Sequence, residues 1–532
     1  MRLSTSVFRY LSALLLVAAA CAPAAPLGSQ AGSAAGRPAP AAGADWVVPQ
    51  TTTPAPIGRE EYARRRSQLA AGMQDGVLVV LGSEEPELDY LPYAQNAPFR
   101  YLTGVTEAGA ALVMVKSGAT VQEHLFVLPR NPEREVWEGA RLGTDGAQAL
   151  TGIAAQTNDR LIPTLESRLP QHRTLYTVTP LPTDAGFPNT LSREQQIVSG
   201  LVARHPGTRV VPVGEAMQRL RATKSPTELD LIRRAVHISV LAHREAMRTT
   251  QPGMNEFEIH ALVEYFFRRY GAERPAYGSI VGSGPNSTTL HYREADRFMN
   301  ADEVLLMDVG AAYRGYAADV TRTIPVSGRF SPDQRAIYEV VLAAQKAAEA
   351  QVRVGATWAE LNQAAERELA QGLARLGLIE SPTATYRCES ARFGNECPQY
   401  RTYYMHGLGH GVGLNVHDPD LSYPIGGGAF GVGSAFTLEP GIYVRADALD
   451  FLPDTPENRA MIQRLRPAVQ RYQNIGVRIE DVYLITDRGV ERASEGAPRE
   501  IAEIEALMAQ ESTYARDRRP ELVEWYRATT PR

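Results

Sequence analysis

The pattern of apolar and polar positions predicts alternating helices and strands in the first third of the chain. An amphipathic helix is expected from Gly58 to about Met73, with further helical patterns near 144–155 and 190–204. Short apolar runs typical of strands lie at 77–81, 99–104, 110–115, 124–129, 175–179 and 208–213. This alternation predicts an α/β domain of its own over residues 58–223.

A second pattern begins near Lys224, where several helix-start signals coincide. Ser225-Pro226-Thr227-Glu228 combines a capping serine, a proline at the first helical position and a glutamate that can reach back to the cap, and it predicts a helix from Pro226 to about Thr250. Asn255 is placed to cap a second helix that ends at Gly271.

The same helix pair recurs about a hundred residues later. Ser331-Pro332-Asp333-Gln334 opens a helix that is expected to end near Gly355, and Thr357 with Glu360 opens another that is expected to end near Gly377. The repeat predicts a domain at 224–510 made of two α–β half-units, with a site between them. The charged tail at 511–532 is expected to be peripheral.

Composition narrows the function classes. The chain has 532 residues, 44% of them hydrophobic and 22% charged, which is ordinary globular material for two or three domains. The formal net charge of −5, with lysines and arginines scattered, excludes nucleic-acid binding as the main function.

The N-terminus predicts export. Arg2 and Arg9 precede an apolar run that is too short to span a bilayer, so residues 1–20 are expected to be a signal peptide. Ala18-Ala19-Ala20 suits ordinary cleavage, and the same tripeptide before Cys21 also resembles a bacterial lipoprotein site; both remain open. The protein is then periplasmic, membrane-anchored or secreted. Residues 21–57, rich in Ala, Pro and Gly, are expected to form a linker.

Two further cysteines, Cys388 and Cys397, are close enough in sequence to form a disulfide in an oxidising compartment. The alternative is a pair of free thiols in a surface insertion.

Candidate chemistry centres on the stretch MHGLGHGVGLNVHD, where three histidines alternate with glycines: His406, His410 and His417. Alone, this stretch could be a glycine-rich turn with incidental histidines. Four carboxylates elsewhere change the interpretation, because each lies in a short apolar run where an isolated charge is costly to bury: Asp308, Asp319, Glu439 and Glu480. A shared cation would compensate all four.

The two aspartates lie on opposite arms of a predicted hairpin. If its turn centres on Tyr313-Arg314, Asp308 faces Asp319 across the strands, and directly opposed like charges repel unless something positive separates them. The alternatives are solvent-facing aspartates and, for Glu439 or Glu480, an ion pair with an arginine such as Arg478.

Four carboxylates with histidine form a ligand set for two divalent ions such as Mn²⁺, Co²⁺ or Zn²⁺. Two such ions can share a bridging hydroxide and polarise a carbonyl, which permits hydrolysis of an amide at neutral pH.

Five stretches, in this order, closely resemble the pita-bread metallopeptidases of the aminopeptidase P and prolidase branch: SIVGSGPNSTTLHY, MDVGAAYRGYAADVTRT, HGLGHGVGLNVHD, TLEPGIY and VRIED. The resemblance covers the chain from about Ile57 to Met508. It implies an N-terminal non-catalytic α/β domain followed by an α+β pita-bread domain with internal pseudo-two-fold repeat.

The resemblance also implies roles for individual residues. Two metal ions, with manganese favoured, would be bound by Asp308, Asp319, His410, Glu439 and Glu480. Asp319 and Glu480 would bridge the ions, and Glu439 would also accept a proton from the attacking hydroxide. His291, His406 and His417 would contact substrate and steady the intermediate, and Arg478 would orient a metal-bound carboxylate.

The function implied is removal of the first residue from peptides with proline at position two. The stretch 418–437 lacks the Lys or Arg with which prolidases meet a dipeptide's carboxylate, so longer peptides are expected to be accepted. The insertion before Met405 is expected to reshape the cleft rim. Alternatives are a prolidase confined to Xaa-Pro dipeptides, a catalytically inactive binding protein on this fold, and a methionine aminopeptidase relative. The family also forms homo-oligomers, so a dimer or tetramer is expected.

Overall fold

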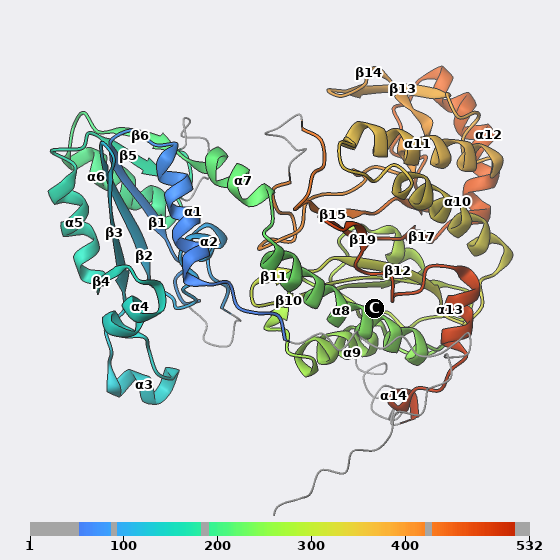
Figure 1. Ribbon diagram of the computed structural model, residues 1–532. Helices are drawn as coiled ribbons and strands as arrows, with labels where there is room; N and C mark the ends of the chain where they lie inside the picture. The colour runs from blue at the N-terminus through green and yellow to red at the C-terminus, as the bar shows by residue number, and fades with distance from the viewer. Residues whose placement is uncertain (1–52, 87–92, 182–190, 421–427, 517–532) are drawn as a thin grey trace, which may run out of the picture. The chain divides into compact units, whose positions relative to one another are not determined.

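The computed structural model describes residues 53–86, 93–181, 191–420 and 428–516 (Figure 1). The expected signal peptide, Cys21, most of the linker and most of the tail lie outside the described residues. Among the described helices, none is both long and apolar enough to cross a membrane.

The N-terminal part is a six-stranded mixed sheet with helices around it. The strand order is β4-β3-β2-β1-β5-β6, and β1 pairs antiparallel with β2 and parallel with β5. The strands are β1 Gly76–Leu81, β2 Ala111–Ser117, β3 Thr120–Val127, β4 Ala154–Thr157, β5 Thr174–Thr177 and β6 Arg209–Pro212. The helices are α1 Arg59–Ala71, α2 Ala97–Thr103, α3 Pro132–Glu138, α4 Gly143–Thr151, α5 Leu161–Arg168, α6 Arg193–Arg204 and α7 Gly214–Ala222.

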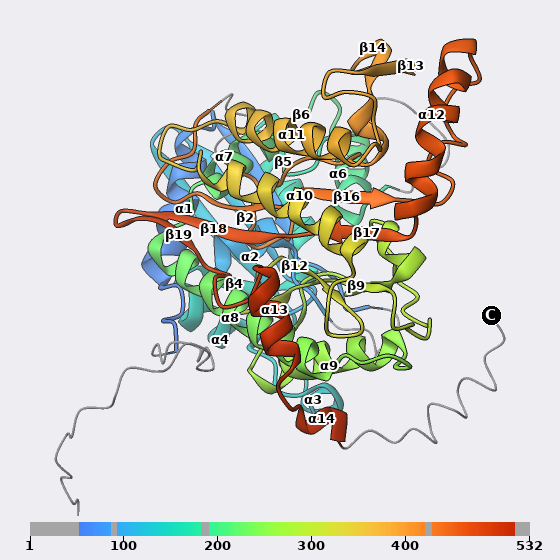
Figure 2. The ribbon, with the colours of Figure 1, turned by 90° about the vertical axis from the view of Figure 1, so that its right-hand side faces the viewer.

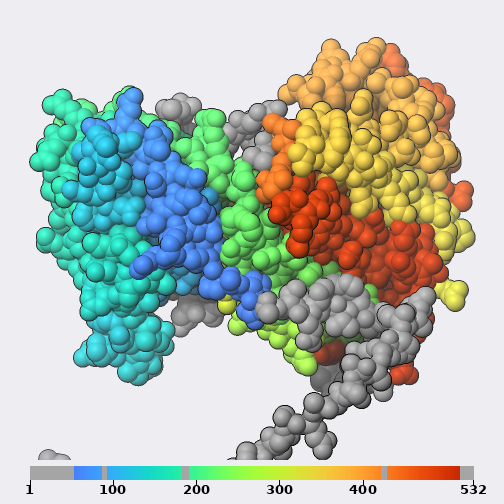
Figure 3. All heavy atoms as spheres, in the orientation of Figure 1, coloured from blue at the N-terminus to red at the C-terminus, as the bar shows by residue number. Residues whose placement is uncertain are grey.

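Two local predictions in this part are wrong. The run 99–104, expected as a strand, belongs to α2, because the Asn96 side chain caps its first turn and Gly104 ends it in the left-handed conformation with φ 72°. The end of the pattern at 144–155 belongs to β4. Trp137 lies in α3 with 86% of its surface exposed, and in the space-filling view the cyan atoms of this region protrude from the rest of the N-terminal part (Figure 3).

The four long helices of the C-terminal part begin where the sequence predicts. They are α8 Pro226–Thr249, α9 Glu256–Arg269, α10 Pro332–Glu349 and α11 Trp358–Arg375. A reciprocal capping box forms at each N-terminus, at Ser225, Asn255, Ser331 and Thr357. Each box satisfies amide donors that a helix start leaves unpaired, so four short sequences determine where these helices begin.

Strands β12 and β17 lie between the pair α8–α9 and the pair α10–α11 in both views (Figures 1 and 2). The strands here are β7 Arg274–Pro275, β8 Ile280–Ser283, β9 Val304–Val309, β10 Ala311–Tyr313, β11 Tyr316–Ala317, β12 Val320–Pro325, β15 Ala435–Leu438, β16 Gly441–Val444, β17 Ile475–Arg478, β18 Asp481–Thr486 and β19 Gly489–Arg492. They form sheets ordered β11-β10-β7, β12-β9-β8, β15-β18-β19 and β16-β17. Three further helices complete this part: α12 Pro456–Tyr472, α13 Ile501–Met508 and α14 Thr513–Arg516.

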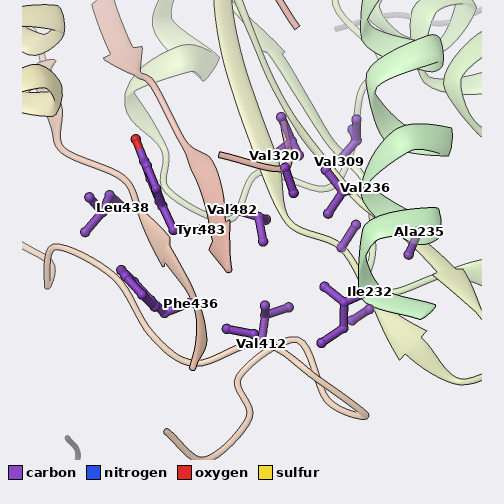
Figure 4. Close-up of a cluster of buried hydrophobic side chains, with 14 of the residues drawn as sticks. Ile232, Ala235, Val236, Val309, Val320, Val412, Phe436, Leu438, Val482 and Tyr483 are labelled. Carbon is purple, nitrogen blue, oxygen red and sulfur yellow. The ribbon is translucent and has the colours of Figure 1, made fainter. Parts of the chain in front are cut away.

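A core of fully buried side chains lies among these elements (Figure 4). Val309, Val320, Leu438 and Val482 contribute to it, and each lies within two residues of one of the four candidate carboxylates. Close packing leaves such side chains little freedom, so the core fixes the backbone on which the carboxylates stand.

The insertion before Met405 contains a two-stranded hairpin, β13 Thr385–Ser390 and β14 Gly394–Pro398. Cys388 and Cys397 form a disulfide across it, with their Cα atoms 5.8 Å apart. The predicted disulfide is thus present.

Candidate metal centre

The sequence places all four carboxylates within strands, but three of them lie in short breaks between strands. Asp308 lies in β9, as expected. The other three lie in short breaks, Asp319 between β11 and β12, Glu439 between β15 and β16, and Glu480 between β17 and β18. A break frees the side chain from strict strand alternation, so donors from separate strands can turn toward one point.

The aspartate hairpin also differs from its predicted register. Its turn is Arg314-Gly315, both with positive φ (48° and 84°), and Asp308 pairs with Thr321 rather than with Asp319. Gly315 explains the shift, because a two-residue hairpin turn of this kind favours glycine at its second position. The aspartates still approach each other, since the Tyr277 hydroxyl lies 2.5 Å from Oδ1 of both.

The remaining donors converge on the same point. Asp319, His410 and Glu480 each offer a ligand atom, and these atoms lie within 4.8 Å of one another. His410 Nε2 is 3.4 Å from Asp319 Oδ2 and 3.4 Å from Glu439 Oε1. The five residues proposed from sequence as metal ligands therefore form one contiguous group that includes Asp308 through Tyr277.

Arg478 pairs with Asp308 and not with Glu480. Its Nη2 lies 2.5 Å from Asp308 Oδ2, and its Nη1 donates to the Tyr443 hydroxyl at 2.7 Å. Glu480 instead accepts from the Thr321 hydroxyl at 2.7 Å. The expected orienting contact of Arg478 on a candidate ligand is present, and the alternative Arg478–Glu480 pair is absent from the contacts of these described residues.

The buried carboxylates of this group would be stabilised by a cation. Burial raises the pKa of Glu480 well above its usual range, and the neighbouring Asp319 and Glu439 raise it further. Burial also raises the pKa of Glu439 to about 7, with His410 and Arg478 acting in the opposite direction. Glu480 Oε1 is buried without a hydrogen-bond partner in the described structure. An unpaired buried oxygen is costly, and a divalent ion would satisfy it, so the residues fit the expected metal.

The histidines differ in environment. Burial would lower the pKa of His410, but its hydrogen bond to Asp319 and the charge of Glu439 raise it to about 9. Burial lowers the pKa of His406 to about 3, and its Nε2 lies 2.9 Å from the Tyr443 hydroxyl. The His417 ring lies 4.0 Å from the His410 ring, centroid to centroid. His291 is exposed, and its charge acts with burial and with His410 to lower the pKa of His417.

Sequence reasoning missed two groups of residues at the site. Tyr277 bridges the aspartates, yet no spacing in the sequence links it to them. Behind Glu480, fully buried Arg322 donates to the Glu480 carbonyl at 2.6 Å and to Asp481 Oδ1 at 2.6 Å, and Arg499 donates to Asp481 Oδ2 at 2.8 Å. This charged network lowers the pKa of Asp481 against the effect of burial and holds the backbone that carries Glu480.

Comparison with known proteins agrees with this geometry. Residues 230–487 match metallopeptidase family M24, and residues 62–176 match the aminopeptidase P N-terminal domain. These ranges lie inside the two domains expected from sequence.

Similar proteins share nearly the whole length. A Xaa-Pro aminopeptidase of Haemophilus influenzae is 36% identical, covering 85% of this chain and 98% of its own. The Xaa-Pro aminopeptidase of Escherichia coli is 32% identical with the same coverage. The structure of E. coli aminopeptidase P with the inhibitor Pro-Leu has a TM-score of 0.72 at 30% identity, covering 87% of this chain and all of that one. This chain therefore belongs to the aminopeptidase P branch of metallopeptidase family M24.

Proposed function

We propose that this metallopeptidase is a Xaa-Pro aminopeptidase that uses two divalent cations, with manganese favoured, to release the first residue from peptides with proline at position two. The observation that carries the proposal is the convergence of Asp308, Asp319, His410, Glu439 and Glu480 on one buried point with an unpaired Glu480 oxygen. The full-length likeness to Xaa-Pro aminopeptidases supports the substrate class.

Individual residues of the chain have separate roles in the proposed reaction. When bound, two divalent ions supply a Lewis acid and a water of lowered pKa. Glu439, whose carboxylate lies 3.4 Å from His410 Nε2, is placed to accept and return a proton. Burial lowers the pKa of His406, so it is neutral at physiological pH: its one N–H donates to the Gly407 carbonyl, and its Nε2 accepts from the Tyr443 hydroxyl. Arg478 holds Asp308 in place.

We further propose that the enzyme accepts peptides longer than dipeptides. Residues 418–437 contain no Lys or Arg that could bind the carboxylate of a Xaa-Pro dipeptide. A dipeptide-specific enzyme needs such a cation, because a buried carboxylate without a partner is costly.

The proposal for location rests on the N-terminal sequence, and the proposal for assembly rests on the family resemblance. We propose that the protein is exported to the periplasm or secreted, either free or anchored by lipid at Cys21, and that it forms a homodimer or homotetramer. The disulfide between Cys388 and Cys397 supports an oxidising compartment.

A turnover screen tests the activity. Chelator-stripped protein is supplied with Mn²⁺, Co²⁺ or Zn²⁺ and offered a Xaa-Pro dipeptide and Xaa-Pro peptides of graded length. We expect turnover that requires metal and rises beyond the dipeptide. Turnover of the dipeptide alone would indicate a prolidase, and metal binding without turnover would indicate a binding protein.

The variant Asp308→Asn tests the site. It removes a ligand charge and the partner of Arg478 at nearly constant shape, so we expect the loss of most turnover with a folded protein. Retention of most turnover in a folded variant would refute the ligand assignment.

A further inference from the structure

The loop that carries His410 and His417 closes on the residue that follows them, Asp418. The Asp418 amide donates to the Gly411 carbonyl at 2.8 Å, and the Asp418 carboxylate accepts from the Asn415 amide at 3.0 Å. Asp418 is only 7% exposed. The Asp418 backbone thus ties the two ends of the loop together, and its buried carboxylate holds Asn415 between them.

Two cations from outside the loop hold this carboxylate. Arg221, in the last turn of α7, donates through Nη2 to Asp418 Oδ1, and Lys224 Nζ lies 3.2 Å from Asp418 Oδ2. Lys224 Nζ also donates to the Pro419 carbonyl at 2.6 Å. Both cations are nearly fully buried, so solvent screens these contacts little.

The segment that carries Lys224 is itself fixed against the catalytic part. The Lys224 amide donates to the Gly433 carbonyl at 2.8 Å. A Cβ atom at Gly433 would lie 2.7 Å from Thr223 Cγ2, and one at Gly413 would lie 2.5 Å from Asp418 Oδ2 and 3.1 Å from Lys224 Cε. Backbone approaches this close leave Lys224 and the loop little freedom to shift relative to each other.

The loop contacts reach the candidate metal centre. His417 directly precedes Asp418, and its ring lies 4.0 Å from that of His410. The Gly413 carbonyl accepts from the Ala317 amide at 2.7 Å, two residues before Asp319. A displacement of Asp418 would therefore move His417 first.

We propose that Arg221 and Lys224 are positioning residues that act on the reaction through Asp418 and His417. They lie at the junction that leads from the N-terminal domain into α8, so this domain contributes to the alignment of a substrate-contacting histidine without touching substrate. The proposal rests on the proposed function and on the substrate contact that the family resemblance implies for His417.

A double-mutant cycle tests it with metal-loaded protein and a Xaa-Pro peptide. Lys224→Met keeps an unbranched apolar side chain as far as Cε and removes the charged Nζ, and it is expected to lower kcat/KM by about 10–100-fold, as loss of an orienting contact typically does. In a His417→Ala background the same change is expected to lower kcat/KM by less than about threefold, because the group that it positions is already gone.

Lys116→Met is the matched control. Lys116 Nζ likewise donates to two carbonyls, of Ala70 at 2.8 Å and Met73 at 2.6 Å, but in the N-terminal domain. This variant is expected to lower the thermal midpoint and leave kcat/KM unchanged. If Lys224→Met does not fold, the isosteric Asp418→Asn replaces it in the cycle.

Effects of Lys224→Met and His417→Ala that simply multiply would overturn the proposal, as would a wild-type kcat/KM in Lys224→Met. A wild-type protein that cleaves no Xaa-Pro peptide at all would overturn the proposed function, and this proposal with it. Wild-type cleavage with multiplying effects overturns the positioning role alone.

Discussion

Removal of the cations is expected to destabilise this protein increasingly as pH rises above pH 5. In the metal-free fold the pKa of Glu439 is about 7, above its ordinary value of 4.5, and the pKa of His410 is about 9, above 6.5. The pKa values of Glu480 and Asp319 are raised as well. These groups bind more protons in the metal-free fold than in the unfolded chain, so their contribution to stability falls as pH rises. Burial lowers the pKa of His237, His243 and His406, which contribute in the opposite direction below about pH 6.5 whether or not metal is bound, so the effect is measured as the difference between loaded and metal-free protein.

The magnitude follows from Glu439. Each tenfold change in proton affinity corresponds to about 1.4 kcal/mol, so the ionisation of Glu439 between about pH 5 and pH 8 costs the metal-free fold about 3 kcal/mol. At about 2–4 °C per kcal/mol for domains of ordinary size, the thermal midpoint of the metal-free protein should fall by about 6–12 °C relative to that of the loaded protein. His410 is in contact with Glu439, so its loss of stabilisation between about pH 6.5 and 9 is not simply additive.

Scanning calorimetry of chelator-treated and metal-loaded protein from pH 5 to 8 measures this difference. Bound cations replace the protons, so the loaded protein should show no such fall. Glu439→Gln is the control and should remove the part of the effect, about 3 kcal/mol, that comes from Glu439. Burial would raise the pKa of Asp308, but Arg478 lowers it overall. Asp308 therefore changes the pH dependence of stability only below about pH 4. A difference between the loaded and the metal-free midpoints that does not widen from pH 5 to 8 would refute the reasoning.

Three other variants probe the support of the site. Tyr277→Phe removes the donor to two candidate ligands and should weaken metal affinity about 10–100-fold in a metal titration; unchanged affinity would contradict the bridge. Arg322→Met removes a buried partner of Asp481 and should lower the unfolding free energy by about 3–5 kcal/mol. A loss below about 1 kcal/mol would contradict the proposed support of the Glu480 backbone by the Arg322–Asp481 pair. Gly409→Ala places a Cβ atom 2.1 Å from a carbonyl oxygen and should cost about 1–3 kcal/mol, whereas Gly407→Ala, with nothing within 4 Å, should be neutral.

Helix starts and candidate ligands could be predicted because their signals are local in sequence. The capping boxes at Ser225 and Ser331 need only four residues, and tertiary packing did not override them. The run 99–104 was misassigned because its aromatic and apolar residues suit a strand equally well. The decisive signals, Asn96 as cap and Gly104 as terminator, lie at or beyond its ends.

Contacts between distant segments could not be predicted. The register of the aspartate hairpin depends on which residues occupy the turn, and a shift of the turn centre by one residue moves each partner by two. Tyr277 and Arg322 contact residues on other strands, and neither residue type at those positions signals such a partner. These contacts arise only once the strands pack together.

The divided origin of the candidate ligands has a consequence for the order of folding. Asp308 and Asp319 follow the first helix pair, whereas His410, Glu439 and Glu480 follow the second. A nascent chain that has emerged only as far as α11 holds two of the five donors, too few to retain a divalent ion. Cation uptake must then wait until the second half has docked on the first, so its time course reports the last step of assembly.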